Sequence, residues 1–484
     1  MHDVAIVGYG PVGATLAGLL GRLGLNVAVF DRALEIYPKP RAVGFDHDAM
    51  RLFQRLGVTK ALADHIAPFR EAIYVGADDR IIQHVKHLPP PYPLTWPPHF
   101  TCDQPGVEKI LRSANATMPQ IEVSLGCTYL NHEQDDDGVR IHLTDADGNA
   151  MSCRARYLVG CDGASSPIRQ QMAVSLESFD YDERWIVVDM KVNEAALARL
   201  PRTNVQYCKP ERPCTFVNCP GNHRRWEFMT LPDDLQDGTA VTDEKLWSLM
   251  APWIAPHEAE IWRSASYRFH ALVADDWQEG RVFLAGDSAH QTPPFLGQGM
   301  CQGLRDAGNL AWKLHPVITG QASDSLLRTY TKERRPNVVE TTRLAKEFGK
   351  IISERDPVKA RARDEKIFAD NNGQARTVVR QNLIPPLQAG FIAAQTPLAG
   401  KVFPQPMLEI FGREPMWMDD LTGPRFRLVV CAEQLAQADL QSLVEAAGTV
   451  GVQVTVLTDQ EGFRPLWPSH VSVCSEKGAL VKNE

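Results

Sequence analysis

Short apolar runs separated by a glycine-rich turn mark the first elements of the chain. Residues 4–7 are apolar and mostly β-branched, the turn runs from Gly8 to Gly13, and an Ala- and Leu-rich stretch follows to about Leu23. A second apolar run, Asn26–Phe30, ends at Asp31. This order predicts a strand, a tight turn, a helix and a second strand.

Later segments show the same alternation of strand and turn signals. Strands are predicted at Val139–Leu143 and Arg156–Gly160, and another should end just before Asp287. An amphipathic helix should begin near Gln298 and run through about Leu314.

The middle block, about residues 180–275, predicts an antiparallel sheet. In its last run, alternation places Arg225, Glu227 and Met229 on one face and the residues between them on the other. One face should roof a substrate. The four strand-like runs are Trp185–Val192, Val205–Cys208, Cys214–Cys219 and Arg225–Thr230.

Composition narrows the class of protein. The chain has 484 residues, 44% of them hydrophobic, and 51 Lys and Arg against 59 Asp and Glu give a net charge of -8. About three domains, or two with insertions, are expected, and the absence of a long basic run argues against a nucleic-acid partner. The apolar stretch Val4–Gly21 is interrupted by glycines and Pro11, so it is not expected to span a membrane.

The ten cysteines form no CxxC pair and no zinc-ligand spacing. We therefore expect reduced thiols, no metal site, and a soluble cytoplasmic protein. His84 and His87 form an HxxH pair, but no carboxylate is placed to complete a metal site, so we interpret them as ordinary polar residues.

The glycine-rich turn has the spacing of a dinucleotide-binding fingerprint. Gly8 would permit the tight turn, Gly10 would let the backbone approach a pyrophosphate, and Gly13 would allow close packing of helix on strand. Asp31 stands where an acid binds ribose, which favours a free 2′-hydroxyl. Both FAD and NAD carry that hydroxyl, so this motif leaves both open.

Two later segments separate these cofactors through a resemblance. The first, Cys161–Arg169, contains Asp162-Gly163, and the second, Gly280–His290, contains Gly286-Asp287 and leads to Gly297-Gln298-Gly299. With the N-terminal turn, they resemble the three fingerprints of the class A single-component FAD-dependent aromatic hydroxylases. The segments that resemble the 3-(3-hydroxyphenyl)propionate hydroxylase branch of that family are Pro40–Gly44, Gln104–Glu108, Arg184–Asp189 and Arg305–Leu314.

The resemblance implies an α/β fold with a Rossmann-type FAD-binding domain of the para-hydroxybenzoate hydroxylase type and an antiparallel-sheet substrate domain. It extends to about residue 350; the tail resembles the thioredoxin-like C-terminal domain of related phenol hydroxylases, but it is short and lacks CxxC, so no redox role is inferred. The implied divisions are 1–75, 100–180 and 276–350 for FAD, 76–99 and 181–275 for substrate, 351–400 as a helical linker region, and 401–484 as the C-terminal domain.

The resemblance also implies which residues bind FAD. Asp31 would hold the adenosine ribose, Asp287 the ribityl or pyrophosphate end, and Asp162 and Arg169 would serve both FAD and the pyridine nucleotide. Cys301 stands where the family often has Asn. The implied FAD-binding set is Gly8, Gly10, Pro11, Val12, Gly13, Asp31, Arg32, Arg41, Gln104, Asp162, Gly163, Arg169, Gly286, Asp287, Pro294, Gly297, Gln298, Gly299, Met300 and Cys301.

The implied reaction belongs to the catabolism of aromatic compounds. NADH or NADPH, docking transiently, would reduce FAD, O₂ would form a flavin C4a-hydroperoxide, and one oxygen would be transferred ortho to a phenol such as 3-(3-hydroxyphenyl)propionate. Pro294, Gly297 and Gly299 should face the flavin, and no catalytic base is assigned. The enzyme should be a monomer or a homodimer.

The substrate contacts are the least constrained part of the sequence. Arg184 or Arg225 could anchor a carboxylate while Trp185 and Tyr207 form an aromatic wall, but sheet core with exposed charge explains these residues equally well. Hydroxycinnamate, resorcinol-like and polycyclic phenols stay open as substrates. The rival functions are another flavoenzyme on this scaffold, an NAD dehydrogenase, and an FAD-binding redox protein without hydroxylase activity.

Overall fold

A computed structural model describes residues 1–235, 241–393, 396–410, 412–459, 468–477 and 481. The chain divides into two compact units, Met1–Leu88 with Pro98–Lys401, and Pro89–Pro97 with Val402–Glu484. Residues 89–97 therefore group with the C-terminal unit, whereas the resemblance implied that they belong to the substrate domain. The finer division of the first unit into FAD and substrate domains stays a prediction.

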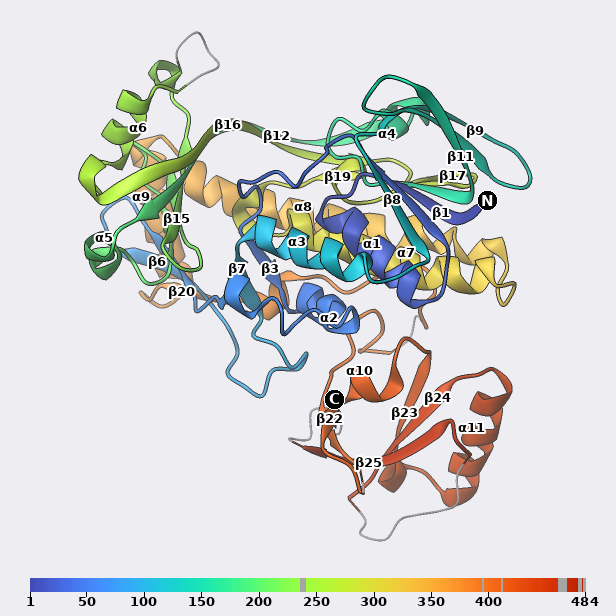
Figure 1. Cartoon of the computed structure of the whole chain (residues 1–484). Coiled ribbons are helices and arrows are strands. Elements are labelled where there is room, and N and C mark those ends of the chain that lie inside the picture. The colour runs from blue at the N-terminus through green and yellow to red at the C-terminus, as the bar shows by residue number, and fades with distance from the viewer. Residues whose placement is uncertain (236–240, 394–395, 411, 460–467, 478–480, 482–484) are drawn as a thin grey trace. The chain divides into compact units, whose positions relative to one another are not determined.

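A largely parallel sheet forms one layer of the first unit (Figure 1). Its strand order is β17-β18-β11-β1-β2-β8, with β9 and β10 forming an antiparallel extension on β11. The central strands are apolar because they are covered on both faces, as in other α/β folds. The bounds are β1 (His2–Val7), β2 (Val27–Asp31), β8 (Ile121–Leu125), β9 (Thr128–Gln134), β10 (Val139–Thr144), β11 (Ala150–Gly160), β17 (Gln278–Glu279) and β18 (Val282–Leu284).

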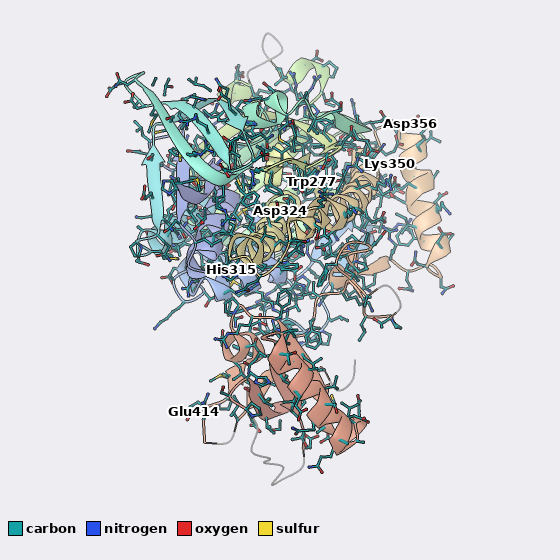
Figure 2. The ribbon with its side chains drawn as sticks, turned by 90° about the vertical axis from the view of Figure 1, so that its right-hand side faces the viewer. Trp277, His315, Asp324, Lys350, Asp356 and Glu414 are labelled. Carbon is teal, nitrogen blue, oxygen red and sulfur yellow. The ribbon has the colours of Figure 1, made fainter. Side chains whose placement is uncertain are left out.

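Helices cover this sheet. Figure 1 shows α1, α3, α7 and α8 running alongside one another beside it. In Figure 2, Lys350 and Asp356 mark the turn where α8 ends and α9 begins, and Asp356 caps α9 by accepting from Val358 N at 2.8 Å. The bounds are α1 (Pro11–Arg22), α2 (His47–Arg55), α3 (Gln104–Asn115), α4 (Pro167–Gln171), α5 (Glu194–Arg199), α6 (Asp243–Met250), α7 (Gly299–Ile318), α8 (Thr329–Ser353) and α9 (Pro357–Asp370).

A nine-stranded sheet forms the second layer, in the order β19-β16-β12-β15-β14-β13-β5-β6-β20. A three-stranded sheet, β3-β7-β4, lies in the same unit. The bounds are β3 (Gly44–Asp46), β4 (Ile66–Pro68), β5 (Ala72–Val75), β6 (Ile81–Lys86), β7 (His99–Cys102), β12 (Leu176–Val192), β13 (Asn204–Tyr207), β14 (Cys214–Asn218), β15 (His223–Met229), β16 (Ala259–Ala274), β19 (His290–Gln291) and β20 (Arg376–Val379).

The antiparallel prediction holds for the middle block, because β12, β14, β15 and β16 pair antiparallel with their neighbours there. The sheet also contains β5, β6, β19 and β20, which lie outside that block. The pairs β5–β13 and β6–β20 are parallel. The last of these strands, β20, lies in the region that we expected to be a helical linker. Parallel partners can be distant in sequence, so the local pattern around residues 376–379 could not reveal this pairing.

The two faces of the nine-stranded sheet differ in chemistry. One face packs into an apolar core that includes Ile186, Phe216, Trp226 and Phe228. Glu227, between the last two, lines a cavity on the opposite face. The alternation predicted for β15 is therefore confirmed, and it assigns the polar positions of these strands to the cavity.

The second unit contains a five-stranded sheet in the order β22-β21-β25-β24-β23. Strands β23, β24 and β25 are parallel, and α11 connects the first two. Its core includes Val444, Val454 and Val456. The bounds are β21 (Met407–Glu409), β22 (Met416–Trp417), α10 (Met418–Thr422), β23 (Arg427–Cys431), α11 (Gln437–Thr449), β24 (Gln453–Leu457) and β25 (Val471–Lys477).

Within the described ranges, no helix combines the length and the apolar character needed to cross a membrane.

Candidate active site

A cavity of about 530 Å³ lies in the first unit. Small-molecule pockets commonly have volumes of about 300 to 1,000 Å³, so it is large enough for a ligand. Its walls come from three sources: the predicted nucleotide loops, the polar face of the nine-stranded sheet, and a group of mainly aromatic and basic residues. The nucleotide loops contribute Gly10, Asp287 and Gly299, and the sheet contributes Gln206, Thr215 and Glu227. The third group includes Phe69, His99, Phe348 and Arg380.

The glycine-rich turn leaves room for a ligand at one of its glycines only. Gly8 has φ +102°, and an added Cβ would lie 2.2 Å from the carbonyl oxygen of Cys161. At Gly13 a Cβ would lie 1.9 Å from the Gly8 carbonyl oxygen. A Cβ at Gly10 would meet nothing within 4 Å, and Gly10 lines the cavity beside Pro11 and Val12 at the start of α1. This arrangement fits a pyrophosphate approaching the backbone and the helix N-terminus.

Asp31 lies at the end of β2, next to this turn. Its Oδ2 accepts from Tyr9 N at 2.6 Å, and its Oδ1 accepts from Ala33 N at 2.8 Å. The carboxylate therefore lies at the position where this kind of fold binds ribose hydroxyls. Neither Asp31 nor its exposed neighbour Arg32 lines the cavity.

Gln104 positions the loop that carries Arg41. The Gln104 Oε1 accepts from the backbone N of Arg41 at 2.9 Å and of Ala42 at 2.7 Å. Both Gln104 and Arg41 line the cavity. Gln104 fixes the backbone of this segment, while the Arg41 side chain remains exposed for an anionic ligand.

The Asp162-Gly163 loop is joined to the Gly286-Asp287 loop by Arg169. Its guanidinium donates to the carbonyl oxygens of Ala164 and Ser288, both at 2.7 Å. Arg169 is buried and does not line the cavity, so its contacts position the two loops. In the structure Arg169 thus holds the two loops together, and its direct contact with a nucleotide stays a prediction.

Asp162 does not line the cavity either, although its neighbours Cys161 and Gly163 do. Its Oδ2 accepts from Ile168 N at 3.2 Å, and its buried Oδ1 has no hydrogen-bond partner among the described residues. Burial raises the pKa of Asp162, against the opposing effect of its hydrogen bonds with Ser166 and Ile168. Direct contact of Asp162 with a nucleotide therefore stays a prediction.

Asp287 reaches the cavity from the turn that follows β18, and its side chain is accessible there. Its surroundings raise its pKa through desolvation, while His290 and Arg41 act in the opposite direction. The carboxylate is thus placed to accept a hydrogen bond from a ligand hydroxyl. Gly286, which precedes it with φ +67°, packs against Val12 of the glycine-rich turn.

Replacing Asp287 with alanine should weaken FAD binding by about ten- to a hundred-fold, because a hydrogen bond to a charged group contributes about 1.5–3 kcal/mol. Flavin fluorescence titration of the apoprotein measures this affinity. The matched control is Asp147→Ala, in an exposed turn that does not line the cavity. Unchanged affinity in D287A would remove Asp287 from the FAD site.

The N-terminus of α7 opens onto the cavity. Gly297 has φ +60°, and the N-cap residue Gln298 makes no side-chain capping bond, so the first amides of the helix lack a capping side chain. Gly297, Gly299 and Met300 line the cavity, whereas the buried Gln298 accepts from Arg305 Nη1 at 3.0 Å. These amides and the helix dipole favour negative charge at this end of the cavity.

Cys301 and Pro294, both predicted to bind FAD, differ in whether they line the cavity. Pro294 lines the cavity as expected. Cys301 is fully buried, its Sγ donates to the Gly297 carbonyl oxygen at 3.6 Å, and it does not line the cavity. The side chain at this position therefore points away from the ligand space.

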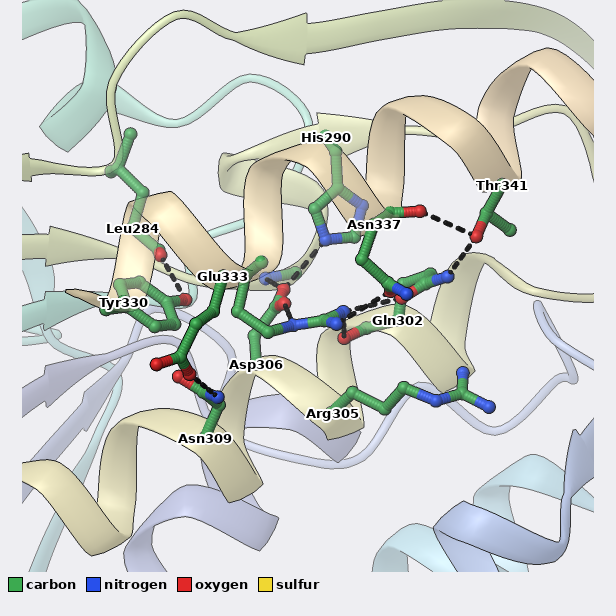
Figure 3. A network of polar contacts seen from close by, with 12 residues as sticks. Leu284, His290, Gln302, Arg305, Asp306, Asn309, Tyr330, Glu333, Asn337 and Thr341 are labelled. Carbon is green, nitrogen blue, oxygen red and sulfur yellow. Dashed lines mark hydrogen bonds and ion pairs between the residues drawn. The ribbon is translucent and has the colours of Figure 1, made fainter. Parts of the chain in front are cut away.

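A buried polar network supports this end of the cavity from behind (Figure 3). Asp306 accepts from Gly286 N at 3.0 Å and from Arg334 Nε at 2.8 Å, and its Oδ2 lies 2.7 Å from His290 Nε2. Arg334 also donates to Gln302 Oε1 at 2.5 Å. The network ties the segment 286–290 to α7 and α8. Trp277, labelled in Figure 2, packs against His290 with ring centroids 5.3 Å apart.

The four predicted substrate residues lie in different places. Arg225 lines the cavity, but its guanidinium donates to both oxygens of Asp189 and to the carbonyl oxygens of Pro40 and Arg41. Burial opposes ionisation of Asp189, yet Arg225 and His223 lower its pKa to about 2. Arg225 is therefore held in a buried ion pair that also fixes the loop at residues 40–41, and it is not available as a carboxylate anchor.

The other three do not line the cavity. Trp185 is fully buried behind Phe295, with ring centroids 5.5 Å apart. Tyr207 packs in the core on the opposite face of the sheet, where its ring centroid lies 5.4 Å from that of Trp253. Arg184 lies three residues before Val187, which does line the cavity, so the two side chains face opposite sides of β12. Alternation along the strands explains the positions of Tyr207 and Arg184.

Several cavity residues were missed by the sequence analysis. Glu227 and Gln206 were not singled out for the site although they share the cavity face, and burial raises the pKa of Glu227 against the effect of Arg225. Phe69, His99 and Arg380 carry no recognisable motif. The alternation that located Arg225 also indicates Glu227, whereas no local signal identifies the others. Among the described residues, no group of three or more His, Cys, Asp or Glu could hold a metal ion.

Comparison with known proteins agrees with the prediction that this chain binds FAD. Residues 1–345 match the family described as "FAD binding domain". A protein of Rhodococcus jostii strain RHA1, named as a probable NADH-specific resorcinol 4-hydroxylase, is 35% identical over 92% of this chain and 83% of its own length. A 3-(3-hydroxy-phenyl)propionate/3-hydroxycinnamic acid hydroxylase of Burkholderia vietnamiensis is 34% identical over 90% of this chain and 81% of its own.

Solved structures share the fold. The flavin-dependent monooxygenase PieE, solved with FAD and substrate, has a TM-score of 0.78 at 21% identity and covers 95% of this chain and 90% of its own. The p-nitrophenol 4-monooxygenase PnpA from Pseudomonas putida DLL-E4 has a TM-score of 0.68 at 26% identity and covers 77% of this chain and 94% of its own.

Proposed function

Because this chain belongs to the FAD binding domain family of FAD-dependent aromatic hydroxylases, we propose that it adds one hydroxyl group ortho to the phenol of 3-(3-hydroxyphenyl)propionate or a similar hydroxyaryl acid. Its co-substrates are O₂ and NADH, with NADPH as the alternative donor. The observation that carries the proposal is the cavity itself, which the nucleotide loops and the polar face of a separate sheet line together.

The proposed reaction balances as a monooxygenation. NADH and one proton deliver two electrons to O₂, one oxygen atom replaces a ring hydrogen as hydroxyl, and the other leaves as water with two hydrogens. When bound, FAD supplies the redox chemistry that links the pyridine nucleotide to O₂. The protein's own residues bind, orient and enclose the reactants.

The residues of the cavity wall and Asp31, which ends the adjoining strand β2, have distinct proposed roles. Gly10 and the start of α1 would bind the pyrophosphate, Asp31 the ribose, and Asp287 the ribityl hydroxyls. The free amides at Gly299 and Met300 would stabilise negative charge on the flavin ring. Phe69 and Phe348 would enclose the aromatic substrate and exclude water, which strengthens the electrostatic contacts in the cavity.

The test is NADH oxidation by the FAD-loaded protein with and without 3-(3-hydroxyphenyl)propionate, with catechol-type product and hydrogen peroxide quantified together. We expect at least a tenfold stimulation of NADH oxidation, with one product formed per NADH. Stimulation that yields only peroxide would show that this phenol is not the substrate. Bound FAD without any stimulation by phenols would support an FAD-binding redox protein instead.

A resorcinol-like substrate is the second candidate within the same chemistry. It is favoured by the similarity to the resorcinol 4-hydroxylase and by the commitment of Arg225 to Asp189, which removes the expected carboxylate anchor. Parallel assays with resorcinol distinguish the two. A higher kcat/KM for resorcinol than for 3-(3-hydroxyphenyl)propionate would replace the acid by the uncharged phenol as the proposed substrate.

A further inference from the structure

Arg380 enters the cavity from a segment that no sequence motif marks. It follows β20, the edge strand that pairs with β6, and begins a short 3₁₀ turn, Arg380–Leu383. Its Nη2 donates to the Leu296 carbonyl oxygen at 2.8 Å and to His99 Nδ1 at 3.1 Å. The guanidinium also lies over the ring of Phe69, 5.6 Å from its centroid. These contacts fix the cation at the cavity wall.

Arg380 has no close counter-ion. Three other arginines of the cavity wall pair with carboxylates: Arg225 and Arg263 with Asp189, and Arg268 with Asp182. No ion pair within 4.0 Å joins Arg380 to a carboxylate in the part of the chain that the structure describes. Because an arginine stays charged and a poorly solvated charge is costly when unpaired, this arrangement favours an anionic ligand.

His99 supplies a second donor beside Arg380. Arginine can only donate, so His99 Nδ1 is the acceptor in their hydrogen bond and the proton of the neutral ring is on Nε2. Burial and the neighbouring Arg380 hold the pKa of His99 well below its usual range, which keeps the ring neutral. A Cβ on Gly44 would lie 2.9 Å from Nε2, and one on Gly297 would lie 3.8 Å away. The Nε2–H therefore lies between two glycines that line the cavity.

The other charged and titratable groups nearby do not replace an anion at this place. Asp46, on β3, is bound by Arg305 of α7 and accepts from Ala49 N. Burial lowers the pKa of His47 on α2 and lowers that of His87 to about 4, so both rings are neutral at pH 7. Burial also raises the pKa of Tyr74 on β5, which keeps its phenol neutral.

We propose that Arg380 and His99 bind the phenolic oxygen of the substrate and hold it as the phenolate. The inference rests on the proposed hydroxylase function and adds the residues that activate the ring. A positive charge and an N–H donor stabilise the ionised oxygen, and an ionised phenol is a stronger electron donor at the ring carbons ortho to it. The aromatic residues Phe69, Tyr74 and Phe348 surround the same part of the cavity and suit a ring.

The position of the pair favours the phenol oxygen over a side-chain carboxylate. Both donors adjoin the Leu296–Gly297 segment, which leads directly into the N-terminus of α7, where the flavin ring is expected. The hydroxyl being activated must lie close to the carbon that reacts. A propionate chain in meta position would place its carboxylate farther from that carbon.

The direct test uses 4-nitrophenol, whose neutral and ionised forms absorb at different wavelengths. Its spectrum is recorded across pH on the FAD-loaded protein without NADH, so no turnover is needed. We expect the bound phenol to ionise at a lower pH than the free one, corresponding to a ten- to hundred-fold preference for the anion, about the effect of one nearby opposite charge. Arg380→Met should abolish that preference, whereas Arg380→Lys should retain part of it.

The matched control is Arg376→Met. Arg376 lies four residues earlier on β20, donates to Gln83 Oε1 at 2.6 Å and does not line the cavity. It should leave the ionisation of bound 4-nitrophenol unchanged. His99→Gln, which keeps an N–H donor near the position of Nε2, should reduce the preference less than Arg380→Met does.

Two further ligands distinguish the sources of the anion. Perturbation of the flavin absorbance reports binding of 3-phenylpropionate, which lacks the phenol, and of 3-methylphenol, which lacks the carboxylate. If Arg380→Met weakens only the binding of 3-phenylpropionate and leaves the ionisation of bound 4-nitrophenol intact, Arg380 and His99 bind a carboxylate and the inference is overturned. If the variant loses FAD but binds nitrophenol as the wild type does, Arg380 serves the flavin and the inference also fails. Neither result depends on whether catechol is formed in the hydroxylase assay.

Discussion

Replacing Gly10 with alanine should lower FAD affinity by about a hundred-fold or more without lowering the stability of the apoprotein. Gly10 faces the cavity, and an added Cβ there would have no protein atom within 4 Å. The methyl group would instead occupy the space through which a pyrophosphate approaches the start of α1. Loss of that approach removes several backbone hydrogen bonds at once, and a hundred-fold corresponds to about 2.7 kcal/mol.

Gly13→Ala is the contrasting variant, because its Cβ would lie 1.9 Å from the Gly8 carbonyl oxygen. It should lower both FAD affinity and apoprotein stability. Flavin fluorescence titration and thermal unfolding of the apoprotein separate the two effects. A Gly10→Ala protein with wild-type FAD affinity would show that the pyrophosphate does not contact this turn.

Replacing Asp306 with asparagine should lower the free energy of unfolding by about 3–5 kcal/mol. Asp306 is fully buried and accepts from Gly286 N and Arg334 Nε, so its loss leaves the Arg334 charge unpaired in the interior. Breaking a buried ion pair by removing one partner has costs of this order. The Gly286-Asp287 turn would also lose its anchor to α7, so FAD retention should fall.

Urea unfolding of the FAD-loaded and apo forms measures both effects. Asp370→Asn is the control, since Asp370 pairs with Lys366 at an exposed i,i+4 position where the pair contributes little. A loss below about 1 kcal/mol in D306N would contradict the role of the network.

The same variant should change the acid dependence of stability. Burial opposes ionisation of Asp306, but His290 and Arg334 outweigh it and lower its pKa. A carboxyl whose pKa is lowered on folding contributes stability above its unfolded pKa, about 3.9, and that contribution disappears as the pH falls through the folded pKa. D306N should therefore lose less stability than the wild type between pH 5 and pH 3.

The sequence was most informative where local physics determines structure. The strand, turn and helix around Gly8 and Gly13 depend on steric limits within a few residues, and the predicted elements differ from the observed ones only at their ends. Alternation along β15 correctly separated Glu227 from Phe228 because each strand residue faces opposite to its neighbours. The grouping of residues 89–97 with the C-terminal unit depends on contacts between distant segments, which no local pattern encodes.

The missed features depend on partners that are distant in the chain. The commitment of Arg225 requires Asp189 on the neighbouring strand and the Pro40 carbonyl oxygen from the loop after β2. Arg380 reaches the cavity because β20 pairs with β6, nearly 300 residues earlier, and nothing in the residues around it predicts that pairing. Local periodicity identifies the face of a strand, but not which segment completes the sheet.

The nine-stranded sheet carries its cavity-lining residues on one face and its core residues on the other. Asn204, Gln206 and Thr215 face the cavity, while Val205 and Phe216, next to them in sequence, belong to the core on the other side. Mutations at the first three positions can therefore alter substrate preference while the packing that stabilises the sheet is preserved. These three positions are therefore suitable for a combinatorial library aimed at new aromatic substrates.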